Sequence, residues 1–341
     1  MALLEVDDLH VSFRTEDGIV QAVRGVSFAV DAGQTLGIVG ESGSGKSVST
    51  QTIMGLTRGA RVTGQALFEG RDLLKLDQAE MRKIRGAQIG MIFQDPLSSL
   101  HPYYRVGWQI VEMIRQHERN VSKEQARKRA VDLLRLVGIP QPDRRVDDYP
   151  HQFSGGMRQR AMIAMAMSLN PKLLIADEPT TALDVTVQAQ VLAVIKTLQQ
   201  EFGTAVLLIT HDLGVIADVA DDVQVMYAGG VMEKADLRTT FFAHHHPYTE
   251  GLLLSLPAYG GDRERLHPIH GQPPSLINLP PGCPFSPRCA YVMDRCRTEV
   301  PQLAAVGSDA THLSACWLPH DVAARSEARR KVIGEPLPAQ S

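Results

Sequence analysis

The sequence predicts an α/β fold built on a parallel sheet. Residues 172–176 (Lys-Leu-Leu-Ile-Ala) and 205–209 are short strands of mainly apolar residues, and a helical segment at about 186–201 lies between them. Buried apolar strands joined through a helix are typical of parallel sheets with helices on their faces. A third apolar run, residues 35–39, leads through a glycine-rich loop into a helix, which indicates another strand of the same kind.

The other elements follow from the spacing of apolar residues. Residues 2–30 largely alternate apolar and polar side chains, which predicts antiparallel strands at the start of the chain. Residues 63–70, punctuated by glycine, indicate a further hairpin, and residues 89–93 form a short buried strand. Helical spacing dominates residues 95–165, and residues 223–233 are expected to form a closing hairpin.

One helix of the helical stretch is marked at both ends. Ser122-Lys-Glu-Gln is a capping box, in which the first and last side chains satisfy free backbone N–H groups at the helix start. Apolar residues follow at helical spacing as far as Val137, and Gly138 ends the helix, as glycine commonly does.

The composition is that of an ordinary globular protein. The chain has 341 residues, of which 44% are hydrophobic and 21% charged, with a net charge of −3. The weak net charge does not favour a general nucleic-acid binder. The first residues lack the layout of a signal peptide, and no run of about 18 apolar residues occurs. We therefore expect a cytosolic chain, unless a partner holds it at a membrane.

The character of the sequence changes after about residue 240. Histidine, proline and glycine become frequent, and two Pro-Pro pairs mark a linker. All four cysteines follow it, and the last residues are charged and expected to be frayed. We divide the chain into a first domain at 1–240, a linker at 241–281, a small Cys-rich C-terminal domain at 282–320 and a flexible tail at 321–341.

The glycine-rich loop, residues 40–47, has the sequence Gly-Glu-Ser-Gly-Ser-Gly-Lys-Ser and matches G-x-x-x-x-G-K-[ST]. Such a loop between a strand and a helix directs backbone N–H groups and the positive helix end at phosphate. Lys46 would reach the β- and γ-phosphates, and the Ser47 hydroxyl would bind Mg²⁺. The chain is therefore predicted to bind a nucleoside triphosphate, with contacts from Gly40, Ser42, Gly43, Ser44, Gly45, Lys46, Ser47 and Val48.

Two further segments carry groups for phosphate chemistry. Asp177 and Glu178 follow an apolar strand, so that Asp177 can join the Mg²⁺ shell and Glu178 can polarise a water. Ser154-Gly155-Gly156 opens a long helix and forms a second anion site. One nucleotide cannot occupy two helix N-termini of one subunit unless they converge. A head-to-tail dimer, in which each phosphate loop faces the Ser-Gly-Gly of its partner, meets this requirement.

The order of these motifs resembles that of the ABC ATPase family. The phosphate loop, Gln94, Ser154–Gly156, Asp177-Glu178, Asp184 and His211 look like its Walker A, Q-loop, signature, Walker B, D-loop and H-loop. The resemblance covers residues 2–235. It implies an ABC-type nucleotide-binding domain, with a RecA-like core, an antiparallel β subdomain and an α-helical signature subdomain at about 95–165.

The resemblance also implies roles for single residues. Gln94 would join Mg²⁺ and the attacking water and report the γ-phosphate to a membrane partner, while His211 would contact the γ-phosphate. Phe13 would stack on adenine, with a core position in the first hairpin as the alternative. The signature departs from the usual pattern, because Met157 stands where the family has glutamine.

The C-terminal part narrows the resemblance to ATPases of oligopeptide and dipeptide importers. His246-Pro-Tyr-Thr and the leucine-rich stretch after it look like the extension of that family, and the cysteines look like its cysteine region. The resemblance implies a heterodimer with a second, homologous ATPase subunit, two integral-membrane permease subunits and an external peptide-binding protein. It also implies a peripheral position at the cytoplasmic face of the bacterial inner membrane.

The cysteines Cys283, Cys289, Cys296 and Cys316 suit either Zn²⁺ or a [4Fe–4S] cluster. Structural zinc usually has short spacings between its ligands, and the wider spacings here favour a cluster, as does the resemblance. Zinc remains an alternative, as do free or disulfide-bonded thiols. His244, His245 and His246 are expected to form a solvated loop rather than a metal site.

Three function classes are compatible with these motifs. The favoured class is an ATP-driven motor for peptide import, in which residues 95–100 would grip a cytoplasmic helix of a membrane subunit. Related importers of nickel, glutathione or haem have similar ATPases. A soluble ABC ATPase acting on ribosomes or DNA usually has two cassettes, whereas this chain has one. A regulatory protein that binds ATP without turnover is disfavoured by Glu178.

Overall fold

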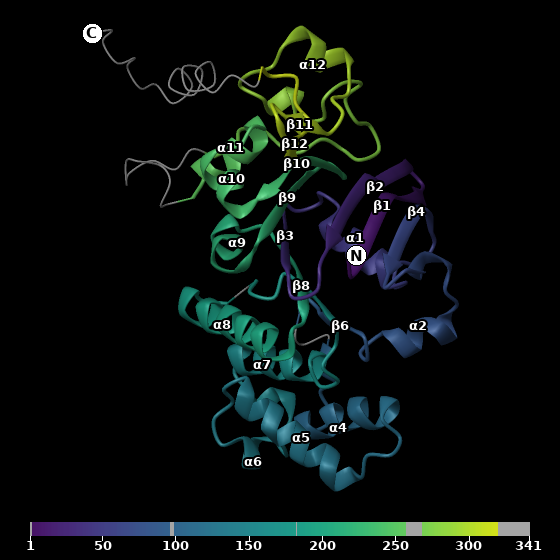
Figure 1. Cartoon of the computed structure of the whole chain (residues 1–341), viewed down its shortest axis with the longest axis vertical. Coiled ribbons are helices and arrows are strands. Elements are labelled where there is room, and N and C mark those ends of the chain that lie inside the picture. Colours follow the sequence, from purple (N-terminus) through teal and green to yellow (C-terminus); the bar gives the residue numbers. More distant parts are fainter. Residues whose placement is uncertain (1, 96–98, 182, 257–267, 320–341) are drawn as a thin grey trace, which may run out of the picture.

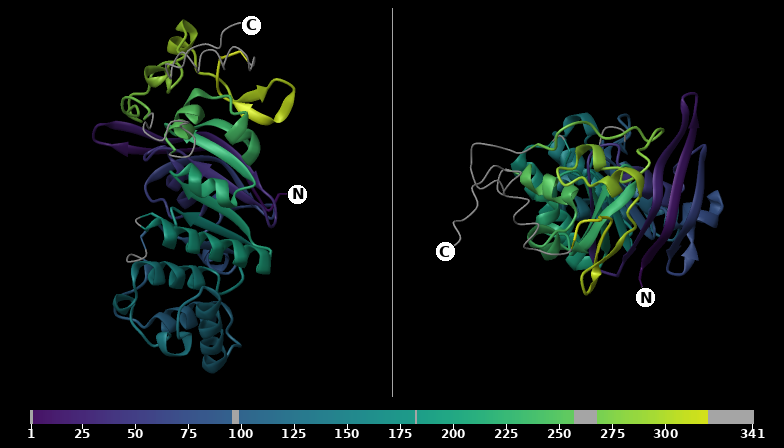
Figure 2. Two further views of the ribbon diagram at one scale, coloured as in Figure 1. Left: turned by 90° about the vertical axis from the view of Figure 1, so that its left-hand side faces the viewer. Right: turned by 90° about the horizontal axis from the view of Figure 1, so that it is seen from above.

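The computed structural model describes residues 2–95, 99–181, 183–256 and 268–319 of the chain. The molecule is elongated (Figure 1), with helices α4 to α6 at one end, the sheets in the middle and the cysteine-bearing segment at the other end. The turned views show the same order along the long axis (Figure 2). The predicted flexible tail at 321–341 lies outside the described residues.

The larger sheet has eight strands in the order β11-β12-β10-β9-β3-β8-β7-β6. Five neighbouring strands, from β9 to β6, run parallel, and the remaining three pair antiparallel. The predicted parallel sheet and closing hairpin are thus confirmed. The strands are β3 (Thr35–Val39), β6 (Ile89–Ile92), β7 (Leu173–Asp177), β8 (Ala205–Thr210), β9 (Asp222–Tyr227), β10 (Gly230–Asp236), β11 (Ala304–Val306) and β12 (Asp309–Ser314).

The smaller sheet is antiparallel, with the strand order β2-β1-β4-β5, as the alternation of residues 2–30 predicts. Its inward side chains, such as Leu4 and Phe28, share one apolar cluster with Leu36 and Ile38 of β3. This packing holds the small sheet against the strand that leads into the phosphate loop. The strands are β1 (Leu4–Thr15), β2 (Gly18–Val30), β4 (Ala60–Phe68) and β5 (Arg71–Asp72).

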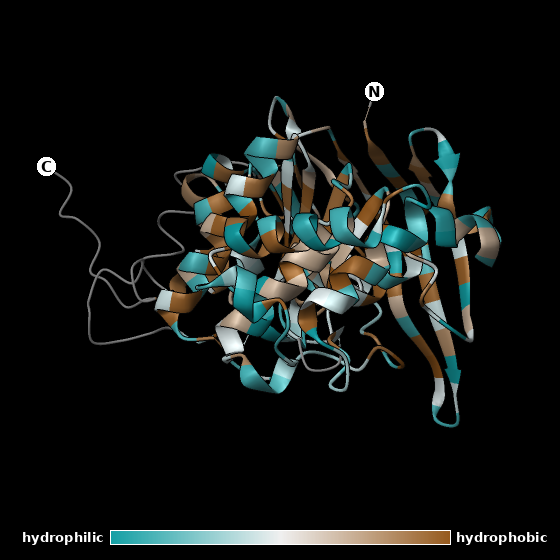
Figure 3. Ribbon diagram, turned by 90° about the horizontal axis from the view of Figure 1, so that it is seen from below, coloured by the Kyte–Doolittle hydropathy of each residue, from teal (hydrophilic) through white to brown (hydrophobic). Residues whose placement is uncertain are grey.

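The helical stretch is confirmed as α4 (Val106–His117), α5 (Lys123–Leu136), α6 (Pro142–Arg145) and α7 (Gly155–Ala166). The predicted capping box of α5 is present, because Ser122 Oγ accepts from the Gln125 N–H at 3.1 Å and Gln125 Oε1 accepts from the Ser122 N–H at 3.0 Å. Hydrophobic and hydrophilic residues alternate along the helices in Figure 3. No helix in the described ranges is long and apolar enough to cross a membrane.

The other helices cover the sheets or connect them. They are α1 (Lys46–Ile53), α2 (Gln78–Ile84), α8 (Val185–Phe202), α9 (Leu213–Val219), α10 (Leu237–Phe242), α11 (Pro247–Leu254) and α12 (Asp294–Thr298), with short 3₁₀ turns η1 (Leu73–Lys75), η2 (Pro150–Gln152) and η3 (Ser286–Arg288).

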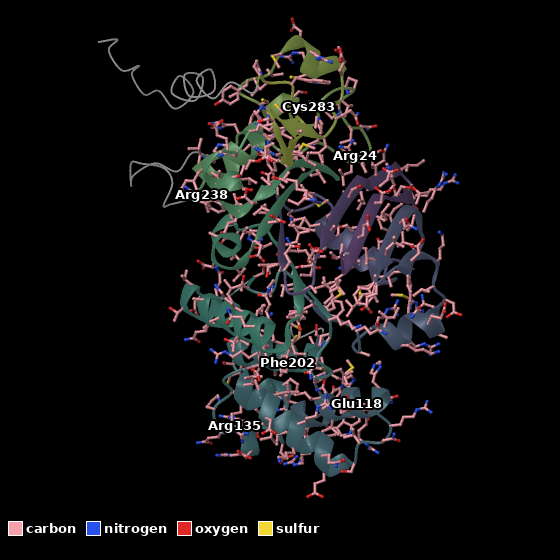
Figure 4. The ribbon with its side chains drawn as sticks, in the orientation of Figure 1. Arg24, Glu118, Arg135, Phe202, Arg238 and Cys283 are labelled. Atoms are coloured by element: carbon pink, nitrogen blue, oxygen red, sulfur yellow. The ribbon has the colours of Figure 1, made fainter. Side chains whose placement is uncertain are left out.

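The sequence pattern does not predict the attachment of the cysteine-bearing segment to the main sheet. Strand β12 pairs with β10, through Glu233 opposite Ser314 and Lys234 opposite Leu313. Cys283 and the helical-subdomain residues Glu118 and Arg135 lie at opposite ends of the molecule in Figure 4. The main sheet therefore extends from the phosphate-loop strand into the C-terminal segment.

Candidate functional site

The phosphate loop (residues 40–47) follows the fully buried strand β3 and opens helix α1. Two of its glycines are required by close backbone approach. A Cβ atom on Gly40 would lie 2.0 Å from the Met226 carbonyl oxygen, and one on Gly45 would lie 2.3 Å from the Ala22 carbonyl oxygen. Gly45 also has a φ of 96°, which residues with a side chain rarely adopt. The backbone therefore wraps tightly, as a cradle for phosphate requires.

The Lys46 side chain folds back onto the start of the phosphate loop. Its ammonium donates to the carbonyl oxygens of Gly40 at 2.6 Å and Glu41 at 2.9 Å. Burial lowers the pKa of Lys46, and the carboxylates of Glu178 and Asp177 oppose that shift. The side chain is thus a buried cation inside the loop, placed to exchange two carbonyl partners for phosphate oxygens.

The two predicted Mg²⁺ ligands Ser47 and Asp177 are in contact. The Ser47 hydroxyl donates to Asp177 Oδ1 at 2.7 Å. Burial raises the pKa of Asp177, and the hydrogen bond from Ser47 acts in the opposite direction. A hydroxyl and a carboxylate oxygen side by side fit the oxygen preference of Mg²⁺. When bound, the metal would be held here and would neutralise phosphate charge.

Glu178 lies next to the other two predicted catalytic residues, Gln94 and His211. Its Oε2 atom accepts from Gln94 Nε2 at 3.1 Å and lies 3.5 Å from His211 Nδ1. It also accepts from the Thr181 hydroxyl at 2.7 Å, a partner that the sequence analysis missed although it lies three residues away. Glu178 has a φ of 49° and donates its backbone N–H to the Ile209 carbonyl. Its backbone is thus held in an uncommon conformation by β8, next to the phosphate loop.

Phe13 lies in β1, opposite Val20 of β2 and Ala60 of β4. Its ring is partly buried against the apolar cluster of the small sheet. This position leaves part of the ring exposed, so both predicted roles of Phe13, adenine stacking and core packing, stay predictions.

The signature and D-loop residues cap two helices at the surface. Ser154 Oγ accepts from the Met157 N–H at 3.3 Å and caps α7, and Asp184 Oδ1 accepts from the Val187 N–H at 2.9 Å and caps α8. Ser154, Gly155 and Asp184 are exposed. Gly156 is packed closely, since a Cβ atom there would lie 2.6 Å from Val187. These helix ends therefore face outward, where a second subunit can reach them.

The predicted solvated loop at His244–His246 is wrong, because the three side chains are 7%, 1% and 1% exposed. The fully buried carboxylate of Glu233, on β10, accepts from the backbone N–H groups of His245 and His246 and lies 2.7 Å from His312 Nε2. His245 Nδ1 lies 2.9 Å from the Ser314 hydroxyl. The histidines thus pack β10 against β12, a contact that no local pattern indicates.

Two C-terminal residues that the sequence analysis did not place in the nucleotide site touch the phosphate loop. The Tyr248 hydroxyl accepts from the Glu41 N–H at 2.8 Å, and Arg288 forms an ion pair with the Glu41 carboxylate. Tyr248 belongs to the recognised His-Pro-Tyr motif, which could have drawn attention to it. Arg288 had no signal in the sequence.

The four cysteines line one small cavity of about 20 Å³, together with His246, Tyr291 and Trp317. Burial raises the pKa of Cys283, and it raises the pKa of Cys289 to about 12. In the described residues, no group of three or more His, Cys, Asp or Glu side chains is arranged to hold a metal ion. The thiols therefore converge without forming a preorganised metal site.

Family models match two parts of the chain. Residues 23–181 match the ABC transporter family, and residues 232–296 match the oligopeptide/dipeptide transporter C-terminal region. The oligopeptide transport ATP-binding protein OppD of Bacillus subtilis is 53% identical over 95% of this chain and 91% of its own length. The chain belongs to the oligopeptide and dipeptide family of ABC transporter ATP-binding proteins. The dipeptide transport ATP-binding protein DppD of the same organism is also 53% identical to this ABC ATPase, over 93% and 94% of the two chains.

Solved structures agree with the ABC part of this assignment. The ATP-binding cassette MJ0796, dimeric in a post-hydrolysis state with ADP and Pi, superposes on this ABC ATPase with a TM-score of 0.63. The match has 29% identity and covers 69% of this chain and 99% of the cassette. The expected ABC-type fold is thereby confirmed, and the chain is an ATPase of this class.

Proposed function

We propose that this chain is the ATP-hydrolysing motor subunit of a membrane importer for dipeptides and oligopeptides. The observation that carries the proposal is a full set of this chain's own hydrolytic residues on a chain with the C-terminal region of peptide transporters. Lys46, Ser47 and Asp177 would hold the phosphates and metal, and Glu178, in contact with Gln94 and near His211, would activate a water. ATP binding would close a dimer, and hydrolysis would reopen it.

The partner in that dimer would be a second, homologous ATPase subunit. Ser154 and Asp184 lie at exposed helix ends, so they can complete the nucleotide site of a neighbouring subunit. Val185, next to Asp184, is 82% exposed, which suits a residue that a partner covers. The dimeric state of the MJ0796 cassette supports the same arrangement.

The shared site leads to a prediction for the purified chain. Alone, it is expected to hydrolyse ATP slowly, and addition of the second ATPase subunit is expected to raise the rate, because each site needs a signature from the other subunit. Ser154→Ala leaves the chain's own Lys46 and Glu178 intact and should lower the rate at the partner's site. Because Ser154 also caps α7, the thermal midpoint of this variant is measured beside its rate. Steady-state phosphate release measures the rates of the chain alone, of the chain with the second subunit and of the variant. A fast rate per chain that does not change with protein concentration would contradict a shared site.

A groove of about 650 Å³ supports docking of a membrane permease subunit. It lies among residues of α2, β6, α4 and α7, and its lining is rich in methionine and other apolar side chains. Methionine surfaces adapt well to an inserted helix. Arg82 and Arg85 line one wall, so the fitting occupant is a cytoplasmic helix with an apolar face and an acidic end. Ser99 of the predicted gripping segment lies in the lining, and residues 96–98 are outside the described part of the chain.

The experiment for the transport function starts from membranes. A tagged chain, extracted with mild detergent, is expected to retain two integral-membrane permease subunits and the second ATPase, which places it at the cytoplasmic face of the bacterial inner membrane. Cells that carry only the Glu178→Gln form should lose uptake of a labelled dipeptide, delivered by the external peptide-binding protein. Lost uptake of nickel, glutathione or haem instead would identify the related importer. Recovery with ribosomes or DNA, and without membrane subunits, would reject transport.

We further propose that the four cysteines hold a [4Fe–4S] cluster, with Zn²⁺ as the alternative. The support is that Cys283, Cys289, Cys296 and Cys316 line one cavity and that four thiolates are the donors both groups take. A metal or cluster binds the thiolate, so binding would displace the thiol protons and would draw the thiols together; burial, which raises the pKa of Cys289, opposes that step. The group would be structural.

The metal proposal predicts the behaviour of single variants. Protein purified without oxygen should be brown, and Cys296→Ser should abolish the colour and lower the thermal midpoint, because ligation would replace apolar core in this proline-rich segment. Metal analysis and visible absorption measure the result. Stoichiometric zinc without iron would select the alternative, and two disulfides in freshly lysed cells would reject both metals.

A further inference from the structure

The phosphate loop carries a negative charge of its own. Glu41 follows Gly40 directly, and its carboxylate is close enough to oppose the lowered pKa of Lys46. Its side chain is 28% exposed, so water screens the charge only in part. A carboxylate in this place repels the triphosphate that Lys46 and the loop N–H groups attract. Some other group must compensate the charge if ATP is to bind tightly.

Arg288 supplies the compensating charge from 247 positions later in the sequence. Its two terminal nitrogens donate to both oxygens of Glu41, Nη1 at 2.6 Å and Nη2 at 2.9 Å. This is the bidentate geometry in which arginine and carboxylate bind most strongly. The Arg288 side chain is only 4% exposed. The pair is therefore shielded from solvent and salt far better than a surface ion pair.

The guanidinium is itself held in place. Arg288 Nε donates to the His270 carbonyl at 3.0 Å and Nη2 donates to the Ile269 carbonyl at 3.3 Å. Nη1 also donates to the Tyr227 hydroxyl at 3.2 Å, and the guanidinium lies 5.7 Å from the centre of that ring. With so many partners, Arg288 has little freedom to leave Glu41.

The backbone of Glu41 is fixed from the same side. Its N–H donates to the hydroxyl of Tyr248, a fully buried residue of α11. That N–H is thereby directed to the tyrosine and not to phosphate. Glu41 is thus held at its backbone by residue 248 and at its side chain by residue 288, both beyond the segment with the ATP motifs.

We propose that Arg288 is a positioning residue of the ATP site, which neutralises Glu41 and turns its carboxylate away from the triphosphate. The C-terminal segment then completes the phosphate loop and sets ATP affinity. The inference rests on the ATP site alone, and neither the transported substrate nor the metal proposed for the cysteine cavity enters it. If the pair instead only fastened the C-terminal segment, a variant without both charges would bind ATP as weakly as one without Arg288.

The test is a double-mutant cycle. A fluorescent ATP analogue measures the affinity of the full-length chain, and phosphate release by the complex with the second ATPase subunit gives KM and kcat. Arg288→Met should weaken binding by about tenfold to a hundredfold, raise KM and leave kcat nearly unchanged, because Glu41 is then uncompensated. Glu41→Gln alone should bind as well as the natural chain or better. Arg288→Met with Glu41→Gln should recover most of the lost affinity, since no charge is left to compensate.

Controls separate the charge from the fold. Arg295→Met breaks a surface pair with Glu299 in the same segment and should not change ATP affinity. If Arg288→Met does not fold, Arg288→Lys keeps the charge and should stay within a few-fold of the natural affinity. The proposal is overturned if the double variant binds as weakly as Arg288→Met, if Glu41→Gln weakens binding, or if Arg288→Lys loses affinity while the thermal midpoint is unchanged.

Discussion

Replacing Glu178 by glutamine is expected to leave ATP bound and to stop its hydrolysis. Glutamine has nearly the same shape and can keep contacts with Gln94 and Thr181, but it cannot take a proton from the attacking water. Loss of a general base costs about 10²- to 10⁴-fold in rate, which corresponds to roughly 3–5 kcal/mol of the activation barrier. The affinity for ATP should stay the same or increase, because a negative charge near the γ-phosphate is removed.

Single-turnover hydrolysis in the assembled complex measures this effect. Glu69→Gln is a matched control, since Glu69 also has a positive φ, of 48°, and pairs with Lys172 away from the site. The control should hydrolyse ATP at the natural rate. Hydrolysis by Glu178→Gln at that same rate would show that another group activates the water.

Replacing Lys46 by alanine should instead remove ATP binding. The ammonium is the one side chain of the phosphate loop that carries a positive charge, and charged hydrogen bonds contribute about 1.5–3 kcal/mol each. Loss of the contacts between Lys46 and the phosphates should weaken the affinity for ATP by at least about 10- to 150-fold. Without nucleotide, the thermal midpoint should also fall, because the Gly40 and Glu41 carbonyls lose the buried ammonium that donates to them.

The rise of the thermal midpoint with added ATP measures this loss, since a ligand that binds only the folded chain stabilises it more, the higher its concentration relative to the Kd. Lys172→Ala, which removes an exposed lysine paired with Glu69, is the matched control and should keep the full rise. A normal rise in the Lys46→Ala variant would mean that the backbone N–H groups alone hold the triphosphate.

The elements that the sequence predicted correctly are those marked by residues close together in the chain. The capping box at Ser122 and the glycines of the phosphate loop are recognisable because the partners lie within a few residues of each other. The strands predicted at 172–176 and 205–209 are recognisable because burial on both faces makes residues 173–176 and 205–209 continuously apolar. In the candidate site, the order of the motifs predicted that Glu178, Gln94 and His211 belong to one site, and the three residues are neighbours in the structure.

Contacts between segments that are far apart in the chain could not be predicted from the sequence. The histidines at 244–246 have the composition of a solvated loop, yet they are buried because Glu233 and His312 come from strands that pair only in the folded chain. The contact between Glu41 and Arg288 joins two charged residues that are each ordinary in their local context. Burial and charge compensation at these places depend on tertiary packing, which periodicity does not encode.

The position of β3 in the sheet has a consequence for the synthesis of the chain. Its two hydrogen-bonded neighbours are β8 and β9, and Thr35 pairs with Val206 while Leu36 pairs with Asp222. At roughly 5–20 residues per second, a ribosome needs about 9–34 s to pass from Thr35 to its partner Val206. During that interval β3 has already left the ribosome as an apolar strand without its sheet neighbours. The small sheet, whose apolar side chains share a cluster with Leu36 and Ile38 of β3, is made largely from the first 70 residues, so we expect it to cover one face of this strand before its neighbours are synthesised.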